Sequence, residues 1–203
     1  YAPYQFANGK VPCCVDQRGA DPVPENDSGG EFLYLIDEVY RYTGDEQLLR
    51  SLWPAVVKTV EYMDQLRMSE RTPENQVGER AAFFGLMPAS ISHEGYSAKP
   101  MHSYWDNFWA LGGYEAAIRI ARTLGEKKQM SAFIASRDQF RSDLYRSLNV
   151  AMRAHDIDYF PVGDVTRLTG LLKLRAEEKQ EQGLEAVLRY FESNANQNIQ
   201  NGY

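Results

Sequence analysis

The sequence predicts an all-α protein made of helical hairpins, arranged as in an (α/α) toroid. Apolar residues recur every three or four positions in four long stretches, as they do along helices. The stretches form two similar units, each with a long loop, a helix apolar nearly all round, a glycine turn and an amphipathic helix. A single hairpin cannot bury its own apolar face, so the repetition indicates an array of packed hairpins. Inner helices covered on both sides and outer helices with one wet face indicate a closed double layer rather than a simple bundle.

The first unit consists of a loop over residues 1–30 and a hairpin over residues 31–68. Turn-forming residues dominate the loop and leave it without apolar periodicity. The leading helix, expected near 30–43, carries apolar residues around most of its circumference, which predicts burial on nearly all sides.

The partner helix, expected near 46–67, has apolar residues on one face only. Thr43 and Glu46 have the spacing of a capping box, which predicts where this helix starts. Pro54 predicts a first-turn position behind a short leading helix, because a proline inside a helix costs about 3 kcal/mol. The face expected to lie in solvent carries Lys58, Glu61 and Asp64.

The second unit repeats this order within the same single domain. A polar stretch over 69–102 predicts a long loop, and loops of this length in compact domains are usually functional. A hairpin over 103–152 follows, with its inner helix expected near 103–124 and its outer helix near 127–152. Residues 165–193 predict one further helix. In this arrangement the loops before the inner helices gather at one mouth of the toroid.

Composition and charge exclude several classes of partner. A net charge of −6 argues against binding to nucleic acid or to an anionic membrane surface, either of which would favour a basic face. No apolar run approaches the roughly 20 residues that span a bilayer, so we expect a soluble protein. The adjacent Cys13 and Cys14 do not suit the usual disulfide geometry, which predicts free thiols in a reducing setting and favours a cytoplasmic location.

The sequence also lacks the signatures of cofactor and nucleophile chemistry. It has no glycine-rich phosphate loop, no Gly-x-Ser-x-Gly elbow and no Cys–His pattern. Its three histidines show no recognised metal-ligand spacing. We therefore expect chemistry that needs neither a cofactor nor a metal.

Two junctions between a loop and an inner helix, at residues 15–32 and 90–109, combine carboxylates, hydroxyls and aromatic rings. Glycoside hydrolysis requires such a set. One carboxylic acid protonates the leaving oxygen, and a second carboxylate activates water or attacks the sugar. The candidate catalytic residues are Glu25, Asp27, Glu94 and Asp106. The candidate substrate-binding residues are Arg18, His93, Tyr96, His102, Tyr104, Trp105 and Trp109.

Two of the acids at these junctions also have a structural interpretation. Ser28 and Glu31, like Ser103 and Asp106, have capping-box spacing, in which the acid bonds back to the helix start. We favour capping for Glu31. For Asp106 both roles stay open, because two tryptophans and a tyrosine surround it in the sequence.

Six short segments follow one another in an order typical of a known superfamily. In the first unit they are Pro-Glu-Asn-Asp-Ser-Gly-Gly-Glu-Phe at 24–32, Tyr-Arg-Tyr-Thr-Gly-Asp at 40–45 and Leu-Trp-Pro at 52–54. In the second unit they are Gly-Leu-Met-Pro at 85–88, Trp-Asp at 105–106 and Ala-Arg-Thr-Leu-Gly at 121–125. In this order they resemble two successive hairpins of the six-hairpin glycosidases, which include bacterial α-L-rhamnosidases, trehalases and glucoamylases.

The resemblance implies an (α/α)6 toroid that hydrolyses a glycosidic bond of a carbohydrate substrate by carboxylate acid–base catalysis, without a cofactor. Six hairpins complete such a ring and this sequence shows two, which implies an incomplete toroid with an open apolar flank. We expect the chain to associate through that flank. Two alternatives stay open. One is a sugar epimerase or polysaccharide lyase on the same toroid, with His93, His102 or Tyr104 as the base. The other is a non-catalytic helical-repeat binding module.

Overall fold

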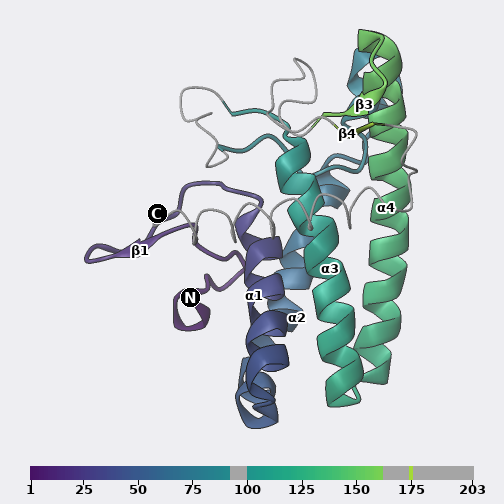
Figure 1. Ribbon diagram of the computed structural model, residues 1–203. Helices are drawn as coiled ribbons and strands as arrows, with labels where there is room; N and C mark the ends of the chain where they lie inside the picture. The colour runs from purple at the N-terminus through teal and green to yellow at the C-terminus, as the bar shows by residue number, and fades with distance from the viewer. Residues whose placement is uncertain (92–99, 162–173, 176–203) are drawn as a thin grey trace, which may run out of the picture.

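The computed structural model describes residues 1–91, 100–161 and 174–175, and its body consists of α-helices (Figure 1). Four α-helices in these residues form two antiparallel hairpins that lie side by side. The first hairpin comprises α1 (Ser28–Thr43) and α2 (Glu46–Ser69), and the second comprises α3 (Tyr104–Leu124) and α4 (Lys127–His155). The all-α prediction is confirmed, and each observed boundary lies within a few residues of the expected one.

The short elements lie outside these helices. Two small antiparallel pairs, β1 with β2 and β3 with β4, flank the helical body. The short elements are η1 (Ala2–Tyr4), β1 (Val15–Asp16), β2 (Gly19–Ala20), η2 (Pro73–Gln76), η3 (Gly78–Ala82), β3 (Tyr159–Phe160) and β4 (Leu174–Arg175). No helix among the described residues is long and apolar enough to cross a membrane.

Helices α1 and α3 approach each other closely because glycines face each other where they pack. A Cβ atom at Gly30 would lie under 3.0 Å from the carbonyl oxygen of Trp109, and one at Gly113 would lie 2.7 Å from the Cα atom of Gly30. Any larger side chain at either position would push the backbones apart. This contact brings the N-terminal ends of α1 and α3 together at one end of the molecule.

Burial distinguishes the two central helices. Helix α3 is buried nearly all round, as predicted, with Tyr104, Leu111 and Tyr114 among its fully buried residues. Helix α1 is not, because Leu35 is 53% exposed and Tyr42 is 86% exposed. The prediction of all-round burial is therefore wrong for α1. An apolar pattern records which faces could be buried, whereas actual burial requires a neighbouring element on each face.

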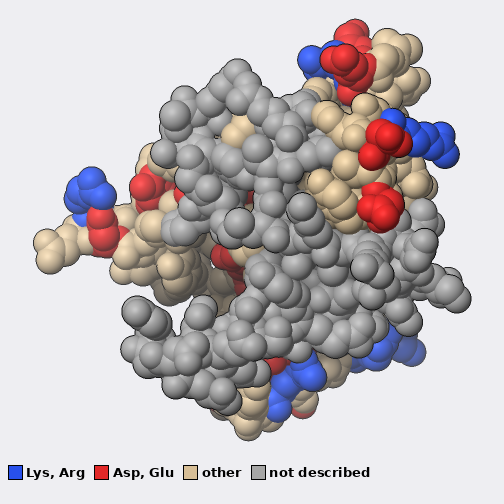
Figure 2. Space-filling view, turned by 45° about the horizontal axis from the view of Figure 1, so that its top comes forward, with Lys and Arg blue, Asp and Glu red and all other residues tan. Residues whose placement is uncertain are grey.

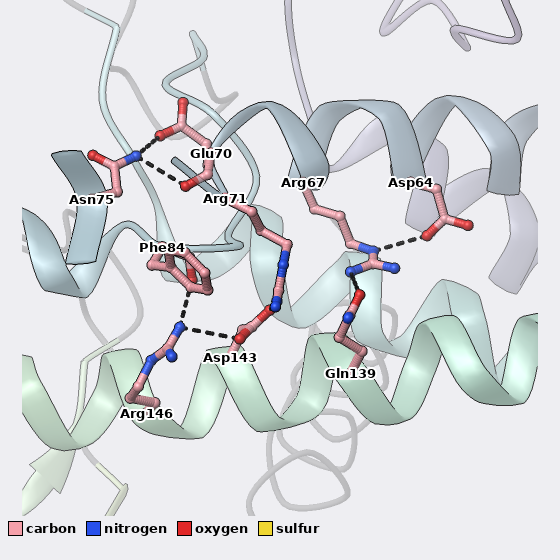
Figure 3. A network of polar contacts seen from close by, with 9 residues as sticks. All are labelled: Asp64, Arg67, Glu70, Arg71, Asn75, Phe84, Gln139, Asp143 and Arg146. Atoms are coloured by element: carbon pink, nitrogen blue, oxygen red, sulfur yellow. Dashed lines mark hydrogen bonds and ion pairs between the residues drawn. The ribbon is translucent and has the colours of Figure 1, made fainter. Parts of the chain in front are cut away.

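Helices α2 and α4 are joined by polar contacts (Figure 3). Asp64 accepts hydrogen bonds from Arg67 Nε, from the Tyr114 hydroxyl of α3 and from Ser136 Oγ of α4, each at 2.8 Å. Arg67, itself buried, also donates to Gln139 Oε1 at 2.7 Å. The prediction that Asp64 lies on a solvated face is wrong, because this carboxylate connects three helices.

A second group of contacts holds the segment after α2 against α4 (Figure 3). Asp143 pairs with both Arg71 and Arg146, and the two guanidinium groups lie 4.6 Å and 4.4 Å from the centroid of the Phe84 ring. Gly85 follows with a φ of +73°, and a Cβ atom there would collide with the Asp143 carboxylate. The chain therefore leaves α2 along a fixed path toward the start of α3.

Two predictions about the start of α2, the capping box and the position of Pro54, are wrong. The N-cap is Asp45, whose side chain accepts from the Leu48 N–H at 2.9 Å, so the capping box predicted for Thr43 and Glu46 is wrong. Pro54 lies inside α2, not in a first turn. The helix continues through the proline because its later turns bury apolar residues in the core, and this packing outweighs the local cost.

The remaining predictions concern the two irregular parts of the chain. The loop expected over 69–102 contains the two short 3-10 helices η2 and η3, and an isolated bridge joins Ser90 to Met101. The helix predicted over 165–193 lies outside the described residues except at Leu174–Arg175. These two residues form a strand, so the prediction is wrong there.

Candidate active site

Two buried carboxyl groups lie where α1 and α3 begin. Asp27 is the N-cap residue of α1 and is 2% exposed, and Asp106, in the first turn of α3, is 0% exposed. The indole Nε1 of Trp105 donates to Asp27 Oδ2 at 2.9 Å, and the hydroxyl of Ser90 donates to Asp106 Oδ2 at 2.5 Å. Trp105 thus connects α3 to Asp27 at the start of α1, and the next residue, Asp106, connects α3 to the preceding loop.

The loop before α3 is fixed to both helix starts. The side-chain amide of Asn26 donates to the Pro88 carbonyl at 2.8 Å, and the Met87 N–H donates to the Asn107 side-chain oxygen at 2.9 Å. Asn26 immediately precedes Asp27, and Asn107 immediately follows Asp106. These backbone contacts position both carboxyl groups without using the carboxyl groups themselves.

Helix capping does not explain either acid. Ser103 is the N-cap of α3 and accepts from the Trp105 N–H at 3.1 Å, which is a capping bond but not the bond to the Asp106 N–H that a capping box uses. Asp106 bonds to Ser90 instead of completing that box. For α1 the predicted box is wrong, because Ser28 is already helical and the N-cap residue, Asp27, makes no side-chain capping bond.

The environment favours the protonated form of both acids. Burial raises the pKa of Asp27, and the hydrogen bond from Trp105 opposes this shift. Burial raises the pKa of Asp106 well above its usual range, and the negative charge of Asp27 adds to the effect. Oδ1 of each carboxyl has no hydrogen-bond partner among the described residues. Buried polar atoms left unpaired are rare in native proteins, and a catalytic role is one explanation for them.

Two further carboxylates surround this pair. Glu25 is half-buried and Glu31 is exposed, and the charges of both contribute to the raised pKa of Asp106. Figure 2, with the top of Figure 1 brought forward, shows a few acidic side chains near the centre of the view and both acidic and basic side chains toward its edges. The role predicted for Glu31 from the sequence was helix capping. Its spacing of one helical turn from Asp27 was the signal that could have placed it in the cluster.

A cavity of about 290 Å³ opens beside this acidic group. The first turns of α1 form one wall, and Trp109 of α3 forms another. Tyr34 and Trp109 meet edge to face with ring centroids 5.7 Å apart, and Trp109 meets Trp105 in the same way at 6.1 Å. The three rings form a continuous aromatic series from the cavity to Asp27. The predicted substrate-binding residues Trp105 and Trp109 thus lie together.

Two other predicted binding residues lie elsewhere. Arg18 belongs to the β1–β2 hairpin, which projects from the helical body, and it pairs with Asp16 at 2.6 Å (Figure 1). Its solvent-exposed position does not bring it to the buried acids. His102 stacks on Phe83 with centroids 4.1 Å apart, and its Nε2 lies 3.4 Å from Glu70 Oε2. This contact lowers the pKa of Glu70.

Tyr104 belongs to the core. It is fully buried, and its hydroxyl shares a 2.8 Å hydrogen bond with Ser147 of α4. Burial raises the pKa of the phenol, so the hydroxyl stays protonated. The structure therefore places the Tyr104 hydroxyl in the core against α4, and its predicted role in substrate binding or as a base stays a prediction. Neighbouring residues of a helix face different directions, and the residue after Tyr104 is the one that reaches the site.

Glu94, His93 and Tyr96, the remaining candidates, lie outside the described residues. Among the residues that the structure describes, no group of three or more His, Cys, Asp or Glu side chains is placed to hold a metal ion. No protein-family model, curated protein or solved structure matches the chain.

Proposed function

We propose that this chain forms part of a glycoside hydrolase in which Asp106 is the general acid and Asp27 is its partner carboxylate. One observation carries the proposal. Two buried carboxyl groups lie at adjacent helix starts, each with one oxygen that has no hydrogen-bond partner among the described residues. Glycosidases of both stereochemical classes use a pair of carboxyl groups in this way.

The two environments support different roles. A general acid must hold its proton near neutral pH, which suits Asp106, because it is fully buried and surrounded by negative charge. The partner must ionise to activate water or attack the sugar. The indole N–H of Trp105 favours the ionised form of Asp27 and so works against burial there. Environments that separate the pKa values of two acids are typical of acid–base pairs.

The two hairpins support a toroid as the wider architecture. Helices α1 and α3 form an inner layer, and α2 and α4 form an outer layer joined by the contacts of Asp64 and Asp143. The exposed apolar face of α1, which includes Leu35, would receive the neighbouring hairpin of a larger ring. The acids would then lie at the mouth of that ring, where a carbohydrate substrate would bind.

Substrate must reach carboxyl groups that are closed off in this structure. Because Asp106 is 0% exposed, this end of the molecule has to open before a sugar can contact its Oδ1 atom. Closure after binding would exclude water from the acid pair and strengthen its electrostatic effects.

The test uses the full-length protein that carries this sequence and a panel of alkyl glycosides, whose leaving oxygen needs a proton. Asp27→Asn and Asp106→Asn should each lower kcat by orders of magnitude and leave the fold intact by circular dichroism. Asp37→Asn is the matched control, because Asp37 is also buried on α1 but pairs with Arg119 at 2.7 Å. Wild-type turnover in both amide variants would refute the site. Failure of the wild-type protein to cleave any glycoside would refute the hydrolase itself.

A further inference from the structure

Ser90 contacts the Asp106 carboxyl from the loop that precedes α3. It is 0% exposed, and its hydroxyl donates to Asp106 Oδ2 at 2.5 Å. Its backbone is fixed by other contacts. The N–H and the carbonyl of Ser90 each bond to the backbone of Met101 at 3.0 Å, and the Ile91 N–H donates to the Pro24 carbonyl at 2.9 Å. The position of the Ser90 hydroxyl is therefore set by the backbone, not by the acid that it contacts.

The Ser90 bond determines which oxygen of Asp106 carries the proton. In a protonated carboxyl group one oxygen carries the proton and the other only accepts hydrogen bonds. Because the Ser90 hydroxyl donates to Oδ2, the proton of the protonated acid lies on Oδ1. Oδ1 is also the oxygen that has no hydrogen-bond partner among the described residues. The proton is thus held on the oxygen that the described part of the chain does not use.

The same bond becomes stronger when Asp106 loses its proton, because a hydroxyl bonds more strongly to a carboxylate than to a neutral carboxyl group. Burial and the negative charges of Asp27, Glu25 and Glu31 raise the pKa of this carboxyl. The bond from Ser90 lowers it. Ser90 therefore offsets part of the cost of forming a charge at this buried position.

From the direction of this bond and the fixed backbone behind it, we infer that Ser90 is a positioning residue for the acid, which holds the proton of Asp106 on Oδ1 and stabilises the carboxylate that forms. The inference rests on the proposed function. In the acid step the Oδ1–H bond breaks and its electron pair stays on the carboxylate. The proton bonds to the leaving oxygen, which takes the electron pair of the broken glycosidic C–O bond.

The test compares Ser90→Ala with the wild type, as full-length proteins, on alkyl glycosides. Loss of the bond should lower kcat by about three- to thirtyfold. It should also move the alkaline limb of the kcat profile to higher pH. The physical reason is that Asp106 loses a bond that favours its ionised form, so its pKa rises further. A purely structural role would lower kcat without moving this limb upward.

Two further variants keep the test sharp. Ser90→Cys has a thiol, which donates more weakly than a hydroxyl, so its kcat and alkaline limb should lie between those of the wild type and Ser90→Ala. It also replaces Ser90→Ala should that variant fail to fold. The matched control is Thr59→Val, which removes the hydroxyl of another residue with 0% exposure. Thr59 donates to the Ala55 carbonyl of α2 at 2.9 Å, so kcat and the alkaline limb should stay at their wild-type values.

Titration of the Asp106 carboxyl by carbon-13 NMR checks the inference without a substrate, and its pKa should be higher in Ser90→Ala than in the wild type. If this rise is seen and the wild type cleaves no glycoside, the proposed function fails and the effect of Ser90 on the acid proton stands. An unchanged titration and an unmoved alkaline limb in Ser90→Ala would overturn the inference, whatever its kcat. Loss of activity in Asp106→Asn alongside that result would leave the acid itself in place.

Discussion

Replacing Trp105 by phenylalanine tests the link between the two helix starts. The change removes the indole N–H that donates to Asp27 Oδ2 at 2.9 Å, and it keeps an aromatic ring at the same position. Because the acceptor is a buried carboxyl, the lost bond should reduce the free energy of unfolding by about 1.5–3 kcal/mol when Asp27 is ionised. The cost should be smaller when Asp27 is protonated, because a bond to a neutral acceptor contributes only about 1 kcal/mol.

The sign of the pH dependence follows from this difference. The hydrogen bond favours the ionised carboxylate, so the cost of Trp105→Phe should grow as pH rises through the pKa of Asp27. Urea unfolding of the full chain from pH 4 to pH 8 measures it. Trp53→Phe is the control, because Trp53 is also half-buried and packs against Phe133.

A double-mutant cycle isolates the bond from other effects of the substitution. Combining Trp105→Phe with Asp27→Asn should give a coupling energy of about 1–2 kcal/mol at neutral pH. The reasoning is refuted if Trp105→Phe costs no more than Trp53→Phe at every pH, or if the cycle shows no coupling. Either result would mean that the contact between α1 and α3 does not hold the Asp27 carboxyl.

Two further predictions concern the same helices. Gly30→Ala should lower the free energy of unfolding by about 1–3 kcal/mol, because its Cβ would strike the Trp109 carbonyl. Gly29→Ala should leave the free energy of unfolding unchanged or raise it by up to about 1 kcal/mol. Thermal or urea unfolding of the two variants measures the difference. Asp106→Asn should gain stability relative to wild type as pH rises above about 4. The raised pKa of Asp106 makes the folded state hold a proton that the unfolded state has lost, so wild-type stability falls with rising pH until the folded pKa is reached. Parallel pH dependences of unfolding in the two proteins would contradict this.

Much of the helical framework was predictable because apolar periodicity survives in a single sequence. The positions of all four helices and the burial of α3 follow from that pattern. The error at Thr43 arose because that residue still belongs to α1 and Asp45 caps α2 instead. The error at Pro54 arose because proline rules ignore packing. The exposure of Leu35 could not be foreseen, since a pattern does not show which neighbours are present.

The candidate site was predictable only in part. Asp27 and Asp106 were identifiable because each lies at the start of an expected buried helix. Their connection through Trp105 was not, because the hydrogen bond joins residues 78 positions apart and depends on how α1 and α3 pack. The core position of Tyr104 could have been predicted, since Tyr104, Phe108 and Leu111 share the i, i+4, i+7 spacing of a core stripe.

The leaving-group dependence of Asp106→Asn, measured in the full-length protein, tests the acid–base assignment most directly. A general acid matters most when the leaving oxygen needs a proton. The account predicts that Asp106→Asn loses orders of magnitude in kcat on alkyl glycosides and little on glycosides with activated aryl leaving groups, whereas Asp37→Asn matches wild type on both. Equal loss on both substrate classes, or wild-type turnover on the alkyl glycosides, would contradict the assignment of Asp106 as the acid.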